Sequence, residues 1–300
     1  MFSAFIGIDW SGARGPRQPG IQLAMARPGK GVPDTWLADD GRHWGRDKVR
    51  DRLLAEASAA NGAPVLVGID FAFAHPFHDE GAYYPGLAAS PPDAPALWHM
   101  VEKVCADDRH LYGGAMFAAE GVGDYYLSPK NHGAPHYRSR RRSTELASRA
   151  SARAPSPTFK AIGADNVATG SMAGMRLIHA LKAALGPRLA VWPFDHVTPG
   201  STGGLAMVLV EIFPSYYFHA AGMNPAKNAA ANPAFMSAAL AAYGSEGVGP
   251  DYAPRGADAD EADAIISAAA LRYFAGRPGC WHAPREAARE GWIFGVPPVT

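Results

Sequence analysis

The sequence is poor in cysteine, carries no net charge and contains no long hydrophobic run. Cys105 and Cys280 are the two cysteines among 300 residues, which excludes a disulfide framework or a four-cysteine zinc cage and is typical of a reducing cytoplasm. The 28 basic and 28 acidic residues balance, so binding of nucleic acid would need a local basic patch. No window approaches the roughly 18 uncharged apolar residues of a membrane span. We therefore expect a cytoplasmic protein with no membrane partner.

Several common catalytic motifs are also missing. There is no P-loop and no complete Gly-x-Gly-x-x-Gly, and the run 170–174, Gly-Ser-Met-Ala-Gly, has the wrong spacing for a nucleophile elbow. The small polar residues 169–171 precede a predicted helix, where they could bind an anion through backbone N–H groups or cap the helix. These absences argue against P-loop, dinucleotide-binding and serine-hydrolase chemistry.

What the sequence does contain is a repeated apolar run that ends in an acid. The runs 5–9, 65–70 and 207–211 end in Asp9, Asp70 and Glu211. Each run predicts a buried strand that delivers a carboxylate to the edge of a sheet. Carboxylates that meet in a low-dielectric site repel one another, so a cation would be needed to hold them together.

Hydrophobic periodicity and turn residues predict an α/β architecture. The first three strands are joined by connections too short for crossovers, which predicts an antiparallel meander, and a helix before the fourth strand predicts that it runs parallel to the first. Residues 113–159 have weak periodicity and are interpreted as an irregular insertion. The predicted strands are 4–9, 21–26, 35–38, 64–70, 189–194 and 205–213; the predicted helices are 44–60, 94–105, 171–185, 214–221, 233–243 and 259–275, the last capped by Asp258 with Glu261 in a capping box.

The last predicted helix adds two further acids. Asp260 and Asp263 are spaced i, i+3 and therefore share one face of the helix, near its N-terminus. If this helix packs on the strands that carry Asp9 and Asp70, the four carboxylates form one cluster, with Glu211 as a fifth candidate. Hard oxygen ligands select Mg²⁺ or Mn²⁺, and a pair of such ions suits in-line attack of water on a phosphodiester. The alternative is that these acids are ordinary turn and cap residues.

Five short motifs together resemble an uncharacterised family of predicted nucleases with an RNase H-like fold. They are Gly7-Ile8-Asp9, Gly68-Ile69-Asp70, Val210-Glu211-Ile212-Phe213-Pro214, Asp260-Glu261-Ala262-Asp263-Ala264 and Glu290-Gly291-Trp292-Ile293. The last helix is also similar to that of Holliday-junction resolvases, whose acids lie on strand one, after strand four and on the last helix. RNase H enzymes place one acid on the first helix instead, where this chain offers Asp47, Asp51 and Glu56 without clear register.

The resemblance implies one RNase H-like domain over residues 1–300, with an insertion at about 75–165. Its sheet would be mixed and five-stranded, three antiparallel strands followed by parallel ones, flanked by helices. It implies hydrolysis of nucleic-acid phosphodiester bonds that depends on Mg²⁺ or Mn²⁺. The catalytic residues would be Asp9, Asp70, Glu211, Asp260 and Asp263, of which Asp9, Asp70 and Asp263 would be metal ligands.

The insertion carries the strongest basic segment of the chain. Arg138, Arg140, Arg141 and Arg142 are predicted to bind the phosphates of nucleic acid, and nearby tyrosines at 125, 126 and 137 could stack on bases. The alternative is a solvated loop paired with acids such as Glu145. Residues 75–79, His-Pro-Phe-His-Asp, resemble a short metal motif without the rest of a zinc site; local hydrogen bonding or an acid–base role near Asp70 are the alternatives for His75 and His78.

Two other functions remain open at this stage. Residues 9–12, Asp-Trp-Ser-Gly, loosely resemble the phosphate-contacting turn of sugar kinases, which would suggest an actin-like-superfamily phosphotransferase or ATPase, although no second glycine-rich turn is evident. A non-catalytic binding protein that retained the fold is the other. The type of nucleic acid and the oligomeric state are not specified by the sequence.

Overall fold

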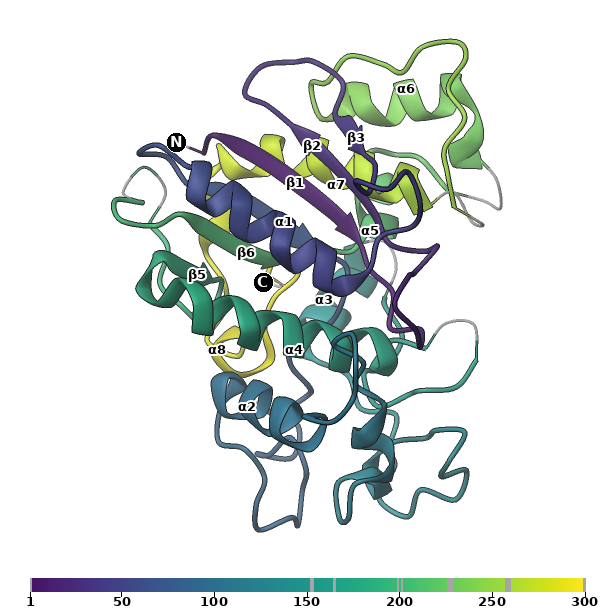
Figure 1. Ribbon diagram of the computed structural model, residues 1–300, viewed down its shortest axis with the longest axis vertical. Coiled ribbons are helices and arrows are strands. Elements are labelled where there is room, and N and C mark those ends of the chain that lie inside the picture. Colours follow the sequence, from purple (N-terminus) through teal and green to yellow (C-terminus); the bar gives the residue numbers. More distant parts are fainter. Residues whose placement is uncertain are drawn as a thin grey trace.

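A mixed sheet lies at the centre of the molecule in the computed structural model, which describes residues 2–151, 154–163, 166–198, 200, 202–225, 229–256 and 260–298 (Figure 1). Within these residues the sheet has six strands in the order β3-β2-β1-β4-β6-β5. The first three strands pair antiparallel, and β1, β4, β6 and β5 run parallel. The strands are β1 Ala4–Asp9, β2 Gln22–Ala26, β3 Asp34–Trp36, β4 Val65–Ile69, β5 Leu189–Val191 and β6 Met207–Glu211.

The predicted α/β class and the antiparallel-then-parallel order are confirmed, but the predicted count of five strands is wrong. The count of five came from the resemblance to RNase H-like nucleases. The strand predicted at 189–194 from its apolar run is present as β5, a three-residue strand that pairs with β6 and extends the parallel half of the sheet.

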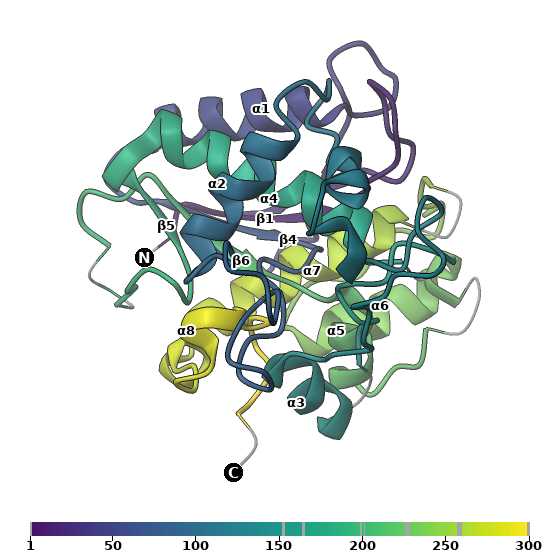
Figure 2. The same cartoon turned by 90° about the horizontal axis from the view of Figure 1, so that it is seen from below.

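Helices cover both faces of the sheet (Figure 2). One face carries α1 Arg46–Ala59, α2 Ala94–Val104 and α4 Ala168–Leu185, and the other carries α5 Pro214–Ala220, α6 Pro233–Ala242 and α7 Asp260–Ala275. Each of these helices lies within a few residues of its predicted position. The predicted cap Asp258 and the first predicted helical residue, Ala259, lie outside the described residues, and the Glu261 side chain binds the backbone N–H and guanidinium of Arg255.

Side-chain alternation along the strands divides the interior into two apolar cores. On the α4 side lie Ile6, Ile8, Val67, Ile69 and Leu209. On the α7 side lie the intervening residues Phe5, Leu66, Val208 and Val210. Because side chains alternate with a period of two, Asp9 and Asp70 continue the α7 side of β1 and β4, whereas Glu211 continues the α4 side of β6.

Two glycines let α7 lie directly on the central strands. Gly7 and Gly68 are opposite each other in the β1–β4 register. A Cβ atom at Gly7 would overlap the carbonyl oxygen of Ala264 on α7, and one at Gly68 would lie 2.9 Å from a methyl group of Leu271. The glycine of each Gly-Ile-Asp run therefore permits the close approach that brings Asp263, next to Ala264, to the end of β1.

The predicted insertion has more regular structure than its weak periodicity indicated. It contains α2, the unpredicted helix α3 Ser143–Ser151 and two 3₁₀ turns, Gly114–Ala118 and Gly123–Tyr125. A four-residue helix, α8 Ala287–Glu290, precedes the last described segment, in which Ile293 forms a parallel bridge with Glu211. None of the helices in the described ranges is long and apolar enough to cross a membrane.

Candidate functional site

The ends of β1 and β4 and the first turn of α7 meet at one edge of the sheet. Asp9 is the last residue of β1, and the Asp70 N–H donates to the carbonyl of Ile8 at 3.0 Å, so the two acids follow neighbouring strands side by side. Asp263 is in the first turn of α7, which Gly7 holds against β1. Asp260 lies beside the loop before β2, with its Oδ2 atom 3.7 Å from where a Cβ of Gly20 would be.

The raised pKa values of these acids reflect burial and the repulsion between their negative charges. Burial raises the pKa of Asp9 well above its usual value, and the charges of Asp263, Asp70 and Asp260 raise it further, although the Trp10 N–H opposes the shift. Burial, Asp263 and Glu211 raise the pKa of Asp70. Burial and the charge of Asp260 raise the pKa of Asp263 to about 7. The structure thus brings together the four aspartates that the sequence analysis placed in one cluster.

No basic side chain of the described residues pairs with Asp9, Asp70 or Asp263, which we call the aspartate cluster. With the side chains in their present positions, no three His, Cys, Asp or Glu side chains of the described residues lie close enough together to hold a metal ion. Mg²⁺ in proteins keeps several waters and commonly takes one or two carboxylates together with substrate phosphates. In donor type and uncompensated charge, the cluster fits such a hard cation.

Glu211 is paired with an arginine and is not part of this cluster, although it lines the same cavity as Asp70; its predicted catalytic role stays a prediction. Its carboxylate accepts two hydrogen bonds from the Arg142 guanidinium, at 2.7 and 2.5 Å, and a third from the Phe73 N–H at 3.0 Å. Glu211 is 3% exposed and ends β6 on the α4 side, whereas Asp9 and Asp70 are on the α7 side. Its charge reaches Asp70, but its oxygens are already occupied by partners from the same chain.

The arginine segment is not a continuous basic surface, which corrects the predicted nucleic-acid patch. Arg142 is buried and also bonds the Glu145 carboxylate and the Glu290 carbonyl. Arg140 is buried and bonds the Asp79 carboxylate and three backbone carbonyls. Arg141 donates to the carbonyl of Pro155, and the exposed Arg138 pairs with Glu80. Of these four arginines, Arg138 alone keeps a largely exposed guanidinium.

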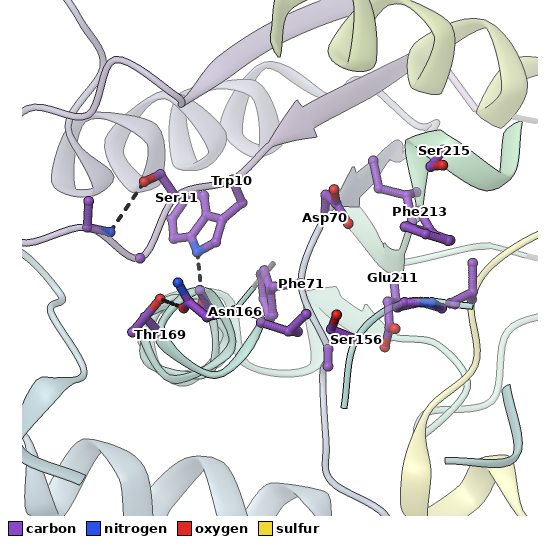
Figure 3. Close-up of a pocket in the computed structure, with 18 of the residues that line it drawn as sticks. Trp10, Ser11, Asp70, Phe71, Ser156, Asn166, Thr169, Glu211, Phe213 and Ser215 are labelled. Carbon is purple, nitrogen blue, oxygen red and sulfur yellow. Dashed lines mark hydrogen bonds between the residues drawn. The ribbon is translucent and has the colours of Figure 1, made fainter. Parts of the chain in front are cut away.

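A cavity of about 630 Å³ opens beside the aspartate cluster, at the carboxyl ends of β1, β4 and β6 (Figure 3). Its wall is formed by the loop after β1, by Asp70 and Phe71, by Phe213 and by the start of α4. The Trp10 indole donates to the carbonyl of Gly170 at 3.1 Å. A Cβ at Gly12 would overlap the backbone of Thr169, so glycine is required where this loop crosses α4. A ligand-sized space thus adjoins the aspartates, as is common at this edge of an α/β sheet.

The residues 169–171 do not cap α4 as predicted. The helix begins at Ala168, the Thr169 hydroxyl donates to Asn166, and Ser171 accepts from the N–H of Ala72. Thr169 and Asn166 line the cavity instead, so their polar groups are part of its wall.

Tyr112 is a cavity residue that the sequence analysis missed. It follows His110 and Leu111, which have φ values of 59° and 52° in the left-handed region that non-glycine residues rarely adopt. Arg46 donates to the carbonyl of His110 at 2.8 Å, and Arg176 donates to that of Tyr112 at 2.6 Å. The signal available in the sequence was Arg176 among the apolar residues of the predicted helix 171–185, since a buried guanidinium must bond specific acceptors.

His75 is part of the core rather than of the site. Its ring nitrogens contact the hydroxyls of Thr158 at 2.8 Å and Tyr126 at 2.7 Å, and its ring stacks on Phe159. Burial, with Arg142 and Arg140 nearby, holds the pKa of His75 well below its usual value. The local hydrogen-bonding interpretation of His75 is confirmed, and the buried Tyr126 is not available to stack on bases.

No protein-family model, curated protein sequence or solved structure matches this chain.

Proposed function

We propose that this chain is a divalent-metal-dependent nuclease of RNase H-like fold that hydrolyses phosphodiester bonds at the aspartate cluster. The observation that carries the proposal is the convergence of Asp9, Asp70 and Asp263 from three separate elements. Burial raises the pKa of all three, and the charge of Asp263 raises those of Asp9 and Asp70 further. Uncompensated carboxylates in such a site favour an external cation, and oxygen donors favour Mg²⁺ or Mn²⁺.

The positions of the acids in the fold support the same proposal. One acid ends the first strand, one follows the fourth strand, and one lies on the last long helix, which is the arrangement implied by the resemblance to resolvase-like nucleases. The acids of α1 have basic partners of their own, since Asp47 pairs with His110, Asp51 with Arg50 and Glu56 with Arg52. None of them is among the charges that raise the pKa of Asp9, Asp70 or Asp263. The first-helix acid of RNase H enzymes therefore has no counterpart at the cluster.

In this proposal the chain's own residues bind and orient the reacting groups. Asp9, Asp70 and Asp263 would hold the cation, which when bound stabilises the charge that develops on the phosphate. Asp70 belongs to the cluster and also lines the cavity, so a phosphate bound in the cavity would meet the cluster at Asp70. The oxygen of a water molecule forms the new bond to phosphorus and the water gives up a proton to solvent, while the ester P–O bond breaks and the leaving oxygen takes up a proton from solvent.

The proposal is tested by nuclease assays with single-stranded, duplex and branched substrates in Mg²⁺ or Mn²⁺. We expect the wild type to cleave at least one of them and Asp70→Asn to lose at least about 100-fold in rate, the scale seen for removing a transition-state-stabilising group. The matched control is Asp51→Asn, which neutralises an exposed aspartate on α1 and should cleave as the wild type does. Equal activity of wild type and Asp70→Asn on every substrate would overturn the proposal.

A further inference from the structure

The cavity beside the aspartate cluster is sized for a small ligand. Its volume is about 630 Å³, within the roughly 300–1,000 Å³ of pockets that enclose single small molecules. A nucleic-acid duplex is recognised instead on an open surface or by an element placed in a groove about 12 Å wide. The space thus suits one nucleotide with its phosphate better than a base-paired segment.

Aromatic side chains form much of the cavity wall, and two of them are held rigidly. Trp10 is fixed by its hydrogen bond to Gly170, and its ring lies 5.9 Å from that of Phe71. Tyr112 is placed by the left-handed residues before it, and its ring packs over Gly114, where a Cβ would collide with it. Such pre-positioned rings offer stacking surfaces at little entropic cost.

Tyr112 is the ring best suited to contact a ligand. It is half-buried, whereas Trp10 is buried and already bonded. Two buried arginines, Arg46 and Arg176, hold the strained backbone on either side of it. Strain that the surrounding structure maintains next to a cavity is a feature of binding sites.

The positive charge at the cavity is small. Arg142 borders it but is bonded to Glu211 and Glu145, and the exposed Arg14 is the other arginine of its wall, with no partner among the described residues. The remaining arginines of the predicted patch are buried or paired. A duplex-binding protein typically neutralises several phosphates, so this wall can serve about one or two.

We propose that the cavity binds one unpaired nucleotide of a single strand, with the base against Tyr112 and the phosphate toward Asp70. This substrate class rests on the proposed nuclease function, and it makes single-stranded nucleic acid the substrate rather than duplexes or branched junctions. Arg14, which has no partner among the described residues, contributes a cation to the cavity wall.

The test measures binding by calorimetry with Ca²⁺ in place of Mg²⁺, comparing a tetranucleotide with a two-turn duplex. We expect the tetranucleotide to bind, with a log–log salt slope between about −0.7 and −1.4, as for one or two phosphates of a single strand. Tyr112→Ala should weaken this binding about 10-fold, and Tyr112→Phe should retain it, because the ring and not the hydroxyl provides the stack. Retention by Tyr112→Phe also shows that the loop tolerates substitution.

The binding assay separates this inference from the proposed function. Tighter binding of the duplex, a salt slope typical of six or more phosphates, or unchanged affinity in a folded Tyr112→Ala variant would overturn the single-strand inference while cleavage at Asp70 could still stand. Absence of tetranucleotide binding would also overturn it. Tetranucleotide binding that depends on Tyr112, without cleavage of any substrate, would support the cavity assignment and overturn the nuclease function.

Discussion

Two carboxylate groups at the ends of neighbouring strands differ in how the chain treats their charge. At the end of β6, Glu211 meets Arg142, which also bonds Glu145, so this buried ion group contains its own cation. After β4, Asp70 meets Asp263 and Asp9 and has no basic partner among the described residues. The first arrangement contains its own cation, whereas the second has none among the described residues and would need one from outside under the proposed function.

The comparison contrasts buried carboxylates that have an internal cation with buried carboxylates that have none among the described residues. Breaking an internally paired group leaves a buried charge without its partner, which is strongly destabilising. Neutralising one member of a like-charged cluster removes repulsion, which is stabilising in the absence of a cation. The same kind of substitution should therefore have opposite effects on stability in the two regions, and this contrast can be measured.

The largest effect is expected from Arg142→Met. Removing the guanidinium leaves Glu211 and Glu145 buried without their shared cation, and we expect a loss of about 3–5 kcal/mol in the free energy of unfolding, measured by urea denaturation. Arg141→Met, one residue away, loses a bond from a half-buried guanidinium to the Pro155 carbonyl and should cost about 1 kcal/mol. Similar losses in the two variants would show that the Arg142 group is not structural.

An effect of intermediate size and opposite sign is expected from Asp263→Asn. Without divalent cation, it should raise the free energy of unfolding at pH 8 by about 1 kcal/mol, because it removes repulsion with Asp9, Asp70 and Asp260. The folded state raises the pKa of Asp263 from 3.8 to about 7, so it binds more protons than the unfolded state between these values. Wild-type stability should therefore fall as pH rises through this window and level off above it.

The measurement for Asp263→Asn is thermal and urea unfolding between pH 5 and 9, with and without Mn²⁺. The variant should show a weaker fall with pH and should lose the stabilisation that Mn²⁺ gives the wild type above pH 7. A variant less stable than the wild type at pH 8 in chelator would contradict the interpretation of the cluster as mutually repelling.

The smallest effect is expected from Glu145→Gln. Burial raises the pKa of Glu145 to about 7 despite Arg142, so near pH 6 its carboxyl is mostly protonated and glutamine imitates that form. We expect a change within about 0.5 kcal/mol in the free energy of unfolding at pH 6, and a small gain at pH 9, where the wild type must hold the ionised form. A loss of several kcal/mol in the free energy of unfolding at pH 6 would instead show that the ionised Glu145, and not Glu211, is the main partner of Arg142.

Local patterns predicted the elements well, because their signals are contained within short windows. Alternating and continuous apolar runs identified β1, β4 and β6, and Asn232 caps α6 by accepting from the N–H groups of Ala234 and Phe235 as its position indicates. Helix α3 was missed because its apolar stripe is short and its buried face includes Glu145, which Arg142 neutralises from outside the helix. The hydrophobic periodicity of a sequence does not reveal that a buried acid is paired with an arginine.

The sequence by itself determined that Asp9, Asp70, Asp260 and Asp263 stand at the ends of elements, because strand and helix periods can be counted along the chain. Only the tertiary structure decided that Glu211 faces the other side of the sheet and that Arg140 and Arg142 are buried, since strand register and long-range ion pairs depend on segments far apart in sequence. Which residues carry a charge is visible in the sequence, whereas which of these charges have a partner depends on how the chain packs.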